Sequence, residues 1–358
     1  MEEKGTVESV ESAGPAAAAE APGTLGTLGT KERLLAFFER NKGIYFSGEE
    51  IAAKLSVSRA AVWKAVNALR GEGYEIDAVS NRGYCLSVHT DILSAQGMGK
   101  YLRPVCSGLE LHVHPTVGST NTLVREKAAA GAPDGYTVVA GAQTAGRGRL
   151  GRRFYSPAGT GVYMSLLLRP EAMPPDRAIR LTTMAAVAAC EAIEELSGET
   201  AQIKWVNDLY MNGKKVGGIL TEGSLGLENG SLDYVVLGIG FNVYLPEGGF
   251  PEELGRIAGA IFRERRSDGK NRLAAAFLNR FMAYHTAGKT ADFAGKYRER
   301  SLVVGKSINV LFPAGQKRAV ALDVDEECRL VVEYEDGAVE RLSSGEISVR
   351  LSERSALV

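Results

Sequence analysis

The dipeptide Asn212–Gly213 is the feature that most restricts how this chain can fold. It joins two strand-like segments, 202–211 and 215–222, and a two-residue Asn-Gly connection between such segments is typical of a tight β-hairpin. The two strands of such a hairpin are antiparallel, so the sequence disfavours a purely parallel, doubly wound sheet. Between residues 107 and 290 strand-like and helix-like segments alternate. The pattern predicts a mixed sheet with helices on one side.

The rest of the chain separates into segments of different pattern, and the whole is expected to be an α+β protein of several domains. Residues 1–30 contain an alanine run, repeated glycines and no aromatic residue, which predicts a disordered tail. The sequence predicts a winged helix-turn-helix domain at 31–88, a linker at 89–106, a central mixed-sheet domain at 107–298 and a small SH3-like β domain at 299–358.

The segment 31–88 has three amphipathic helical stretches followed by two short strands around Asn81–Gly83. This order is typical of a winged helix-turn-helix, although a small helical packing module has a similar pattern. The basic residues concentrate on the third helix and on the turn between the strands, where contacts to phosphates and bases are made. The candidate DNA-binding residues are Ser58, Arg59, Lys64, Asn67 and Arg82.

Composition excludes several classes of protein. Lys and Arg total 42 against 43 Asp and Glu, so nucleic-acid binding must be local. No apolar run is long enough for a transmembrane helix, and the acidic start MEEKG does not resemble a signal peptide. The four cysteines are far apart and form no CxxC motif, which favours free thiols in a reducing compartment. We therefore expect a cytoplasmic protein without a membrane partner.

The segment 140–161 contains a literal GxGxxG motif, formed by Gly146, Gly148 and Gly151. A dinucleotide-binding fingerprint must open a helix, whereas strand-forming residues and Pro157 follow here, so this interpretation is rejected. Four arginines lie between residues 147 and 153, and no acidic residue occurs from 135 to 170. Such a loop is suited to phosphate or carboxylate binding, the alternative being a solvated basic loop.

Two later segments add charged and glycine residues to this pattern. Lys204, Asn207 and Asp208 follow one another closely before the hairpin turn, and Lys214 and Lys215 come directly after it. Adjacent strand residues point to opposite faces, so only one of the two lysines can face a site. The glycine pairs Gly217–Gly218 and Gly238–Gly240 suggest close approach of a ligand to the backbone.

Taken together, these motifs resemble those of the biotin protein ligases, specifically the bifunctional kind that also represses biotin genes. The resemblance rests on the following motifs, which appear in the family's order: STN at 119–121, GRGRLGR at 146–152, KWVND at 204–208, KVGGIL at 215–220, GIGFN at 238–242 and SGEISVR at 344–350. Val206 departs from a usual proline and Phe154 from a frequent tryptophan.

The resemblance implies an ATP-dependent reaction in two steps, through biotinyl-5′-AMP to an amide on a lysine of a biotin carboxyl carrier protein. Lys215, Arg149 and Asp208 become the candidate catalytic residues, with Asp208 either positioning Mg²⁺ or deprotonating the incoming lysine. The nucleotide would contact Arg149, Arg152, Lys204, Asn207 and Asn242. Biotin would contact Ser119, Thr120, Asn121, Gln143, Gly146, Arg147, Lys215, Gly217, Gly218, Gly238 and Gly240.

The resemblance also implies operator DNA as a partner and a homodimer when the adenylate is bound, with the adenylate as corepressor. Two alternatives remain open at this point. A lipoate-attaching relative would share the fold, and a biotin-sensing transcription factor without catalysis would share the domains. The retention of Lys215, Arg149 and Asp208 argues against the second alternative, and the arginine loop with the winged helix argues against the first.

Overall fold

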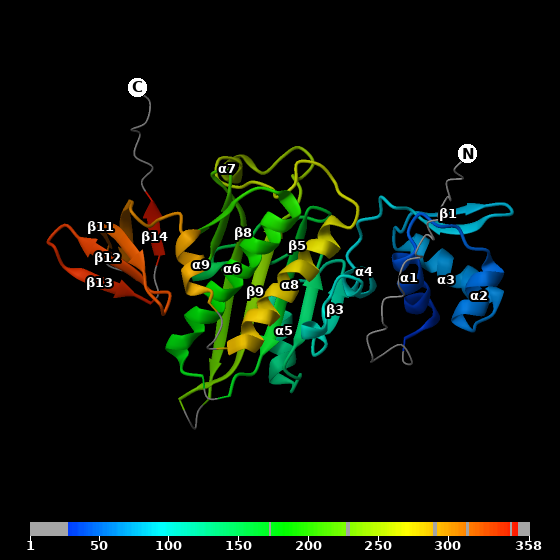
Figure 1. The fold of residues 1–358 in the computed structure, drawn as a ribbon, viewed down its shortest axis with the longest axis horizontal. Helices are drawn as coiled ribbons and strands as arrows, with labels where there is room; N and C mark the ends of the chain where they lie inside the picture. The colour runs from blue at the N-terminus through cyan, green and yellow to red at the C-terminus, as the bar shows by residue number, and fades with distance from the viewer. Residues whose placement is uncertain are drawn as a thin grey trace, which may run out of the picture.

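The computed structural model describes residues 28–171, 173–226, 230–288, 292–312, 315–343 and 346–349. The predicted tail at 1–30 therefore lies outside the described residues except for its last three, and so do Ser344, Gly345 and Arg350 of the last motif. Figure 1 shows a central sheet with helices, flanked at opposite ends by a small N-terminal unit and a small C-terminal β unit. Within the described residues no helix combines the length and the apolar character that crossing a membrane requires.

The N-terminal unit is the predicted winged helix-turn-helix. Ser47 begins the second helix through a capping box with Glu50, and Ser58 caps the third helix by accepting a hydrogen bond from the Ala61 amide. The unit has its own core, built around Phe38, Ile51 and other apolar side chains. Its elements are α1 (Thr30–Arg40), α2 (Gly48–Leu55), α3 (Arg59–Gly71), β1 (Ile76–Val79) and β2 (Gly83–Leu86).

The segment 89–106 was expected to be a linker, but it is folded against both of its neighbours. It contains the short helix α4 (Ala95–Gly99), which packs on α1 and α8, and a 3₁₀ turn at Pro104–Cys106. Met98 and Cys106 are buried. Gly97 and Gly99 lie within α4, and Pro104 begins the 3₁₀ turn. The residues that indicated a linker are therefore part of short helical elements.

A buried cluster of four charged side chains joins the N-terminal unit to the central domain. Lys42 Nζ lies 2.5 Å from Asp268 Oδ1, and Lys100 Nζ lies 2.7 Å from Glu39 Oε2 and also pairs with Asp268. The four side chains are between fully buried and 14% exposed. Because Glu39 and Lys42 belong to the N-terminal unit and Asp268 precedes α8, these pairs fix the two domains to each other.

The central domain is a seven-stranded mixed sheet in the order β3-β4-β5-β9-β8-β7-β6. Only β3 and β4 are parallel; the other neighbours are antiparallel, as the Asn212–Gly213 turn between β7 and β8 requires. Both turn residues have positive φ, which asparagine and glycine tolerate. The strands are β3 (Glu110–His114), β4 (Tyr136–Ala140), β5 (Gly161–Leu168), β6 (Ala201–Lys204), β7 (Asp208–Met211), β8 (Lys214–Leu225) and β9 (Leu232–Asn242).

The prediction that residues 202–211 form one strand is wrong. The chain reverses after Lys204, and β6 pairs with β7 so that Lys204 lies opposite Asp208. Trp205 and Val206 in the connection are buried, and the Trp205 indole donates to the Cys328 carbonyl of the C-terminal unit. Their apolar side chains continue the strand-like pattern through the reversal, so the polar residues that follow, Asn207 and Asp208, did not mark it as a turn.

Helices cover both faces of the sheet, so the expectation of helices on one side is also wrong. On one face lie α6 (Ala178–Ser197) and α8 (Gly269–Ala287), with α9 (Ala294–Glu299) beside α6. On the other face α5 (Thr120–Ala129) packs through Val124 against Val138, Leu167 and Val236. The alternation of these strand residues with Val139, Leu166 and Val235, which face the larger core, places α5 on the opposite side.

The C-terminal unit is a five-stranded antiparallel sheet in the order β13-β12-β11-β10-β14. Its apolar side chains, among them Val310, Ala321 and Leu330, belong to the same hydrophobic cluster as α6, α8 and the central sheet. The segment after α9 also runs along the outer edge of β6. The strands are β10 (Ser307–Phe312), β11 (Gly315–Val324), β12 (Leu330–Tyr334), β13 (Val339–Leu342) and β14 (Glu346–Val349).

Candidate active site

Three adjoining cavities follow strand β8 and form one cleft. The first and second share Arg147, Phe154, Gly218 and Leu220, and the second and third share Arg149, Asn207, Ile219 and Leu220. Their volumes are about 30, 130 and 510 Å³. The cleft changes character along its length, from polar to cationic to apolar.

The first cavity lies at the start of α5, and apart from Arg147 its polar lining groups are uncharged. Gln143 Oε1 accepts from the Thr120 amide at 2.9 Å, and Gln143 Nε2 donates to Ser156 Oγ at 3.0 Å. The Ser165 hydroxyl donates to Asn121 Oδ1 at 2.6 Å and lies 2.8 Å from Thr120 Oγ1. Ser119 caps α5 by accepting from the Thr122 amide. This end therefore offers a rigid set of donors and acceptors suited to a neutral polar ring system.

Two glycines form the floor of this cavity, and Phe154 covers them. Gly218 lies opposite Gly240 across β8 and β9, and a Cβ on Gly240 would stand 2.7 Å from Phe154 Cε1. A Cβ on Gly238 would meet Asn121 Oδ1 at 1.9 Å. Gly238 and Gly240 are needed because Asn121 and Phe154 occupy the space that a larger residue would take, whereas a Cβ on Gly218 would stand at least 3.4 Å from its neighbours.

For the biotin that the motif resemblance places in this cavity, replacing Gly240 with alanine is expected to weaken binding. The added methyl displaces the Phe154 ring that covers the cavity, and a misfit of about 1–3 kcal/mol should raise KM for biotin about tenfold or more with little change in KM for ATP. Steady-state pyrophosphate exchange measures both constants. The double variant Gly240→Ala, Phe154→Ala should recover part of the loss, and equal KM values for Gly240→Ala and the parent chain would contradict this role.

The second cavity is strongly cationic. Lys215 Nζ lies 2.5 Å from Asp208 Oδ1, and the two side chains are 30% and 23% exposed. Arg149 donates to Asn207 Oδ1 at 3.1 Å, and Asn207 donates to the Ile219 carbonyl. Arg147 pairs with Glu222 at 3.0 Å. The cavity is lined by one carboxylate, Asp208, and by the cations Arg147, Arg149, Arg152, Arg153 and Lys215.

The third cavity is mainly apolar and extends to the C-terminal unit at Ser343. Part of its wall comes from the motifs, through Arg149, Val206 and Asn207. The opposite wall comes from Ile179 and Thr182 of α6, which belong to no motif and were not predicted. Only the three-dimensional arrangement brings these two α6 residues beside Arg149 and Asn207.

Four of the predicted contact residues line none of the three cavities: Lys204, Asn242, Gly146 and Gly217. Asn242 donates to the main-chain carbonyls of Lys215 and Gly259, so in this structure it holds the strand that carries Lys215. A Cβ on Gly146 would meet the Phe154 carbonyl at 2.5 Å, and one on Gly217 would meet the Gly240 carbonyl at 2.8 Å. These two glycines allow close chain packing behind the cleft.

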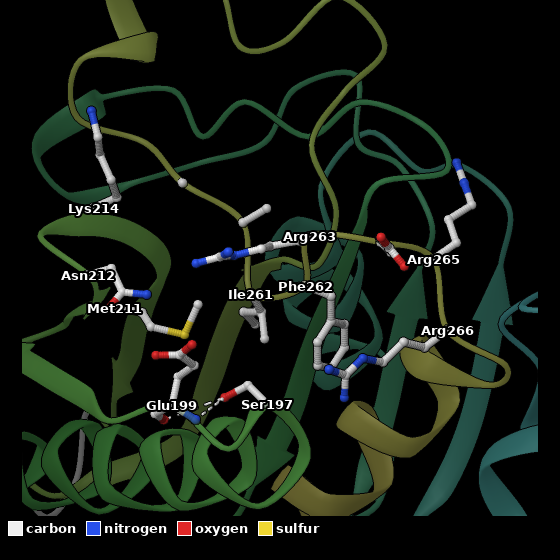
Figure 2. A pocket seen from close by; sticks show the side chains of 13 residues that line it. Ser197, Glu199, Met211, Asn212, Lys214, Ile261, Phe262, Arg263, Arg265 and Arg266 are labelled. Atoms are coloured by element: carbon white, nitrogen blue, oxygen red, sulfur yellow. Dashed lines mark hydrogen bonds between the residues drawn. The ribbon is translucent and has the colours of Figure 1, made fainter.

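A separate cavity of about 370 Å³ lies beside the β7–β8 turn and contains none of the predicted site residues. Figure 2 shows Arg263 reaching across it between Lys214 and Met211. Lys214 donates to the Gly255 and Arg256 carbonyls, on the side away from the cleft. Of the two adjacent lysines, Lys215 therefore faces the cationic cavity and Lys214 does not.

A protein-built metal centre is not found in the described part of the chain, where no three His, Cys, Asp or Glu side chains gather. Asp208 is the single carboxylate of the cationic cavity. One carboxylate fits a magnesium ion that is carried mainly by substrate phosphates, which is how Mg²⁺ is commonly held.

The candidate DNA-binding residues lie on the outside of the N-terminal unit. Arg59, Lys64 and Asn67 are exposed on α3, and Ser58 is its N-cap. Arg82 lies between β1 and β2 with its guanidinium 4.1 Å from the Tyr45 ring centroid. The basic residues of the helix and of the wing are exposed, while Val62, Ala65, Val66 and Leu69 of α3 are buried.

The fold and the site together define a ligase of the biotin and lipoate type with an attached helix-turn-helix domain. Family models match in the same order: an HTH domain at residues 30–85, the biotin/lipoate A/B protein ligase family at 113–242 and the biotin protein ligase C-terminal domain at 303–350. The biotin protein ligase of Aquifex aeolicus, solved with biotin and ATP, is similar over 67% of this chain and 98% of its own, with a TM-score of 0.56 and 28% identity.

Relatives that match over nearly the full length of the chain identify its family more narrowly. The chain is 35% identical to the bifunctional ligase/repressor BirA of Bacillus subtilis over 89% of this chain and 98% of that protein. It is 27% identical to the Escherichia coli protein of the same name, over 87% and 95% of the two chains. The chain belongs to the family of bifunctional ligase/repressor proteins.

Proposed function

We propose that the cleft activates biotin with ATP and then transfers it to a lysine of a carrier protein. In the first step a biotin carboxylate oxygen bonds to the α-phosphorus, and the bond to the β-phosphate oxygen breaks to release pyrophosphate. In the second step the lysine amine bonds to the acyl carbon, AMP leaves, and the amine loses a proton. The observation that supports this proposal is the order of the three adjoining cavities along the cleft, from polar through cationic to apolar.

Each cavity suits one part of the adenylate. The polar cavity around Gln143 and Thr120 has the donors and acceptors for the ureido ring, and the apolar cavity around Ile179 suits a nucleoside. The cationic cavity between them offsets the repulsion between a carboxylate and a triphosphate. Arg149 and Arg152 are assigned to the phosphates, and Lys215 to the point where carboxylate and α-phosphate meet.

Asp208 has two proposed roles. Its carboxylate is one ligand of magnesium carried by the triphosphate, or it accepts the proton from the carrier lysine after pyrophosphate has left. Its ion pair with Lys215 places it beside the reacting atoms for either role. The basic loop 146–153 would close over the adenylate and protect it from water.

Biotin-dependent exchange of labelled pyrophosphate into ATP tests the first step directly, with lipoate as the parallel substrate. We expect exchange with biotin and none with lipoate. Exchange with lipoate alone would be consistent with the fold and with acyl-adenylate formation, but it would contradict the assignment of the polar cavity to the ureido ring of biotin. No exchange with either acid would contradict the proposed ligase activity and favour a biotin-sensing transcription factor without catalysis.

The second function follows from the winged helix. We propose that the adenylate-bound chain forms a homodimer whose two N-terminal units bind a two-fold operator. In the described residues Thr221–Leu225 of β8 pair with β9 on one side and with no strand on the other, which leaves an edge for a second copy. Sedimentation should show a dimer with biotin and ATP, and an unchanged monomer would contradict this arrangement.

A further inference from the structure

The single aromatic side chain of α3 belongs to none of the hydrophobic clusters of the described residues. Trp63 is 62% exposed on α3, whereas Val62 and Val66 beside it are fully buried. Tryptophan is enriched at surfaces that contact a partner, because its large apolar face gains from burial while its N–H can still bond. Its exposed neighbours on the same face are Arg59, Lys64 and Asn67, together with the small Ala60.

Trp63 stands one helical turn after Arg59 and one turn before Asn67. All three are exposed, so they form a continuous outward stripe opposite the buried face. An arginine and an asparagine in such a stripe can make paired hydrogen bonds to guanine and adenine edges in the major groove. The indole between them has a single donor and a large apolar face.

We propose that Trp63 reads thymine in the operator through contact with its 5-methyl group. This methyl is the one apolar feature of the major-groove edge, and apolar side chains recognise it by contact. The inference rests on the proposed DNA-binding function, and it assigns to Trp63 a specificity role that Arg59 and Asn67 cannot fill. Lys64, the next residue, remains available for phosphate.

The test starts from a random DNA duplex library selected with the full chain in the presence of biotin and ATP. Each thymine of the enriched duplex is then replaced by uracil, which lacks only the 5-methyl group. For the parent chain one uracil position should weaken binding about tenfold, as a mismatched position does. For Trp63→Ala binding should be weaker, and uracil at that position should have no further effect.

Two controls separate this role from a structural one. Val339→Ala removes an exposed apolar side chain, 56% exposed, from the C-terminal unit and should leave DNA binding unchanged. Trp63→Ala should retain biotin-dependent pyrophosphate exchange and its unfolding midpoint. Since the chain has two tryptophans and Trp205 is buried, DNA should also change the fluorescence of the parent chain but not of Trp63→Phe.

The outcomes are distinguishable. If the parent chain enriches no duplex, the DNA-binding function itself fails, and the inference fails with it. If it enriches a duplex that Trp63→Ala binds equally well, or if the full uracil penalty persists in Trp63→Ala, DNA binding stands and the role of Trp63 is overturned.

Discussion

Replacing Lys215 with alanine should lower biotin-dependent pyrophosphate exchange by about 100- to 1000-fold. Removal of one preorganised group that stabilises charge in a transition state typically has this effect. Lys215 lines the cationic cavity and pairs with Asp208, so no other described lysine occupies its place beside the reacting atoms. The loss should appear in kcat for adenylation more than in KM for biotin.

The neighbouring lysine provides a matched control. Lys214 has the same charge and lies one residue away, but its amine donates to the Gly255 and Arg256 carbonyls outside the cleft. Lys214→Ala should therefore retain exchange within a few-fold of the parent chain. Full exchange by Lys215→Ala at saturating biotin and ATP, or equal losses in the two variants, would show that the catalytic assignment is wrong.

Asp268→Asn should lower the free energy of unfolding by about 3 kcal/mol, because it leaves the buried amines of Lys42 and Lys100 short of one countercharge. Asparagine keeps the shape of the side chain and tolerates the positive φ of residue 268. Denaturant unfolding measures the change. Glu335→Gln, in an exposed pair with Arg318, should change stability by less than about 1 kcal/mol.

The same substitution has a defined pH dependence. Burial acts to raise the pKa of Asp268, but the hydrogen bonds and charges of Lys100 and Lys42 outweigh it and hold the pKa below its ordinary value of 3.8. A carboxyl with a lowered pKa contributes stability above its ordinary pKa and loses it as the pH falls. The difference between Asp268→Asn and the parent chain should therefore be full near neutral pH and shrink below about pH 4. A constant difference down to pH 3 would contradict this account.

The fold was predictable where local signals and tertiary structure agree. The capping residues of α2 and α3, the Asn212–Gly213 turn and the alternating strands all have local physical causes. The reversal at Trp205–Asn207 was missed because its apolar residues are buried by the C-terminal unit, which no local pattern reveals. The position of α5 was missed for a related reason, since which sheet face a helix covers depends on the strands around it.

The candidate site was predictable to the extent that charge and glycine spacing mark it. Residues of the arginine loop, Asp208 and Lys215 come together around one cavity as the motifs indicated. Gly217 lies behind the cleft, because adjacent residues of a strand face opposite sides and Gly218 faces the cleft. Asn242, at the end of β9, instead donates to the main-chain carbonyls of Lys215 and Gly259. The wall that α6 gives to the apolar cavity could not be predicted from the sequence, since Ala178, Ile179 and Thr182 belong to no motif and come from a distant segment.

The hydrophobic clusters divide this chain unevenly, and that division has an evolutionary meaning. The winged helix closes its own core, whereas the C-terminal sheet and the ligase sheet share one. Loss of the N-terminal unit exposes the buried charged cluster and the surface of α4 that packs on α1. Loss of the C-terminal sheet instead exposes apolar side chains of the core that it shares with the ligase sheet. The winged helix-turn-helix, and with it gene regulation, is therefore the part that a lineage can gain or lose. The C-terminal sheet must be kept together with the ligase domain.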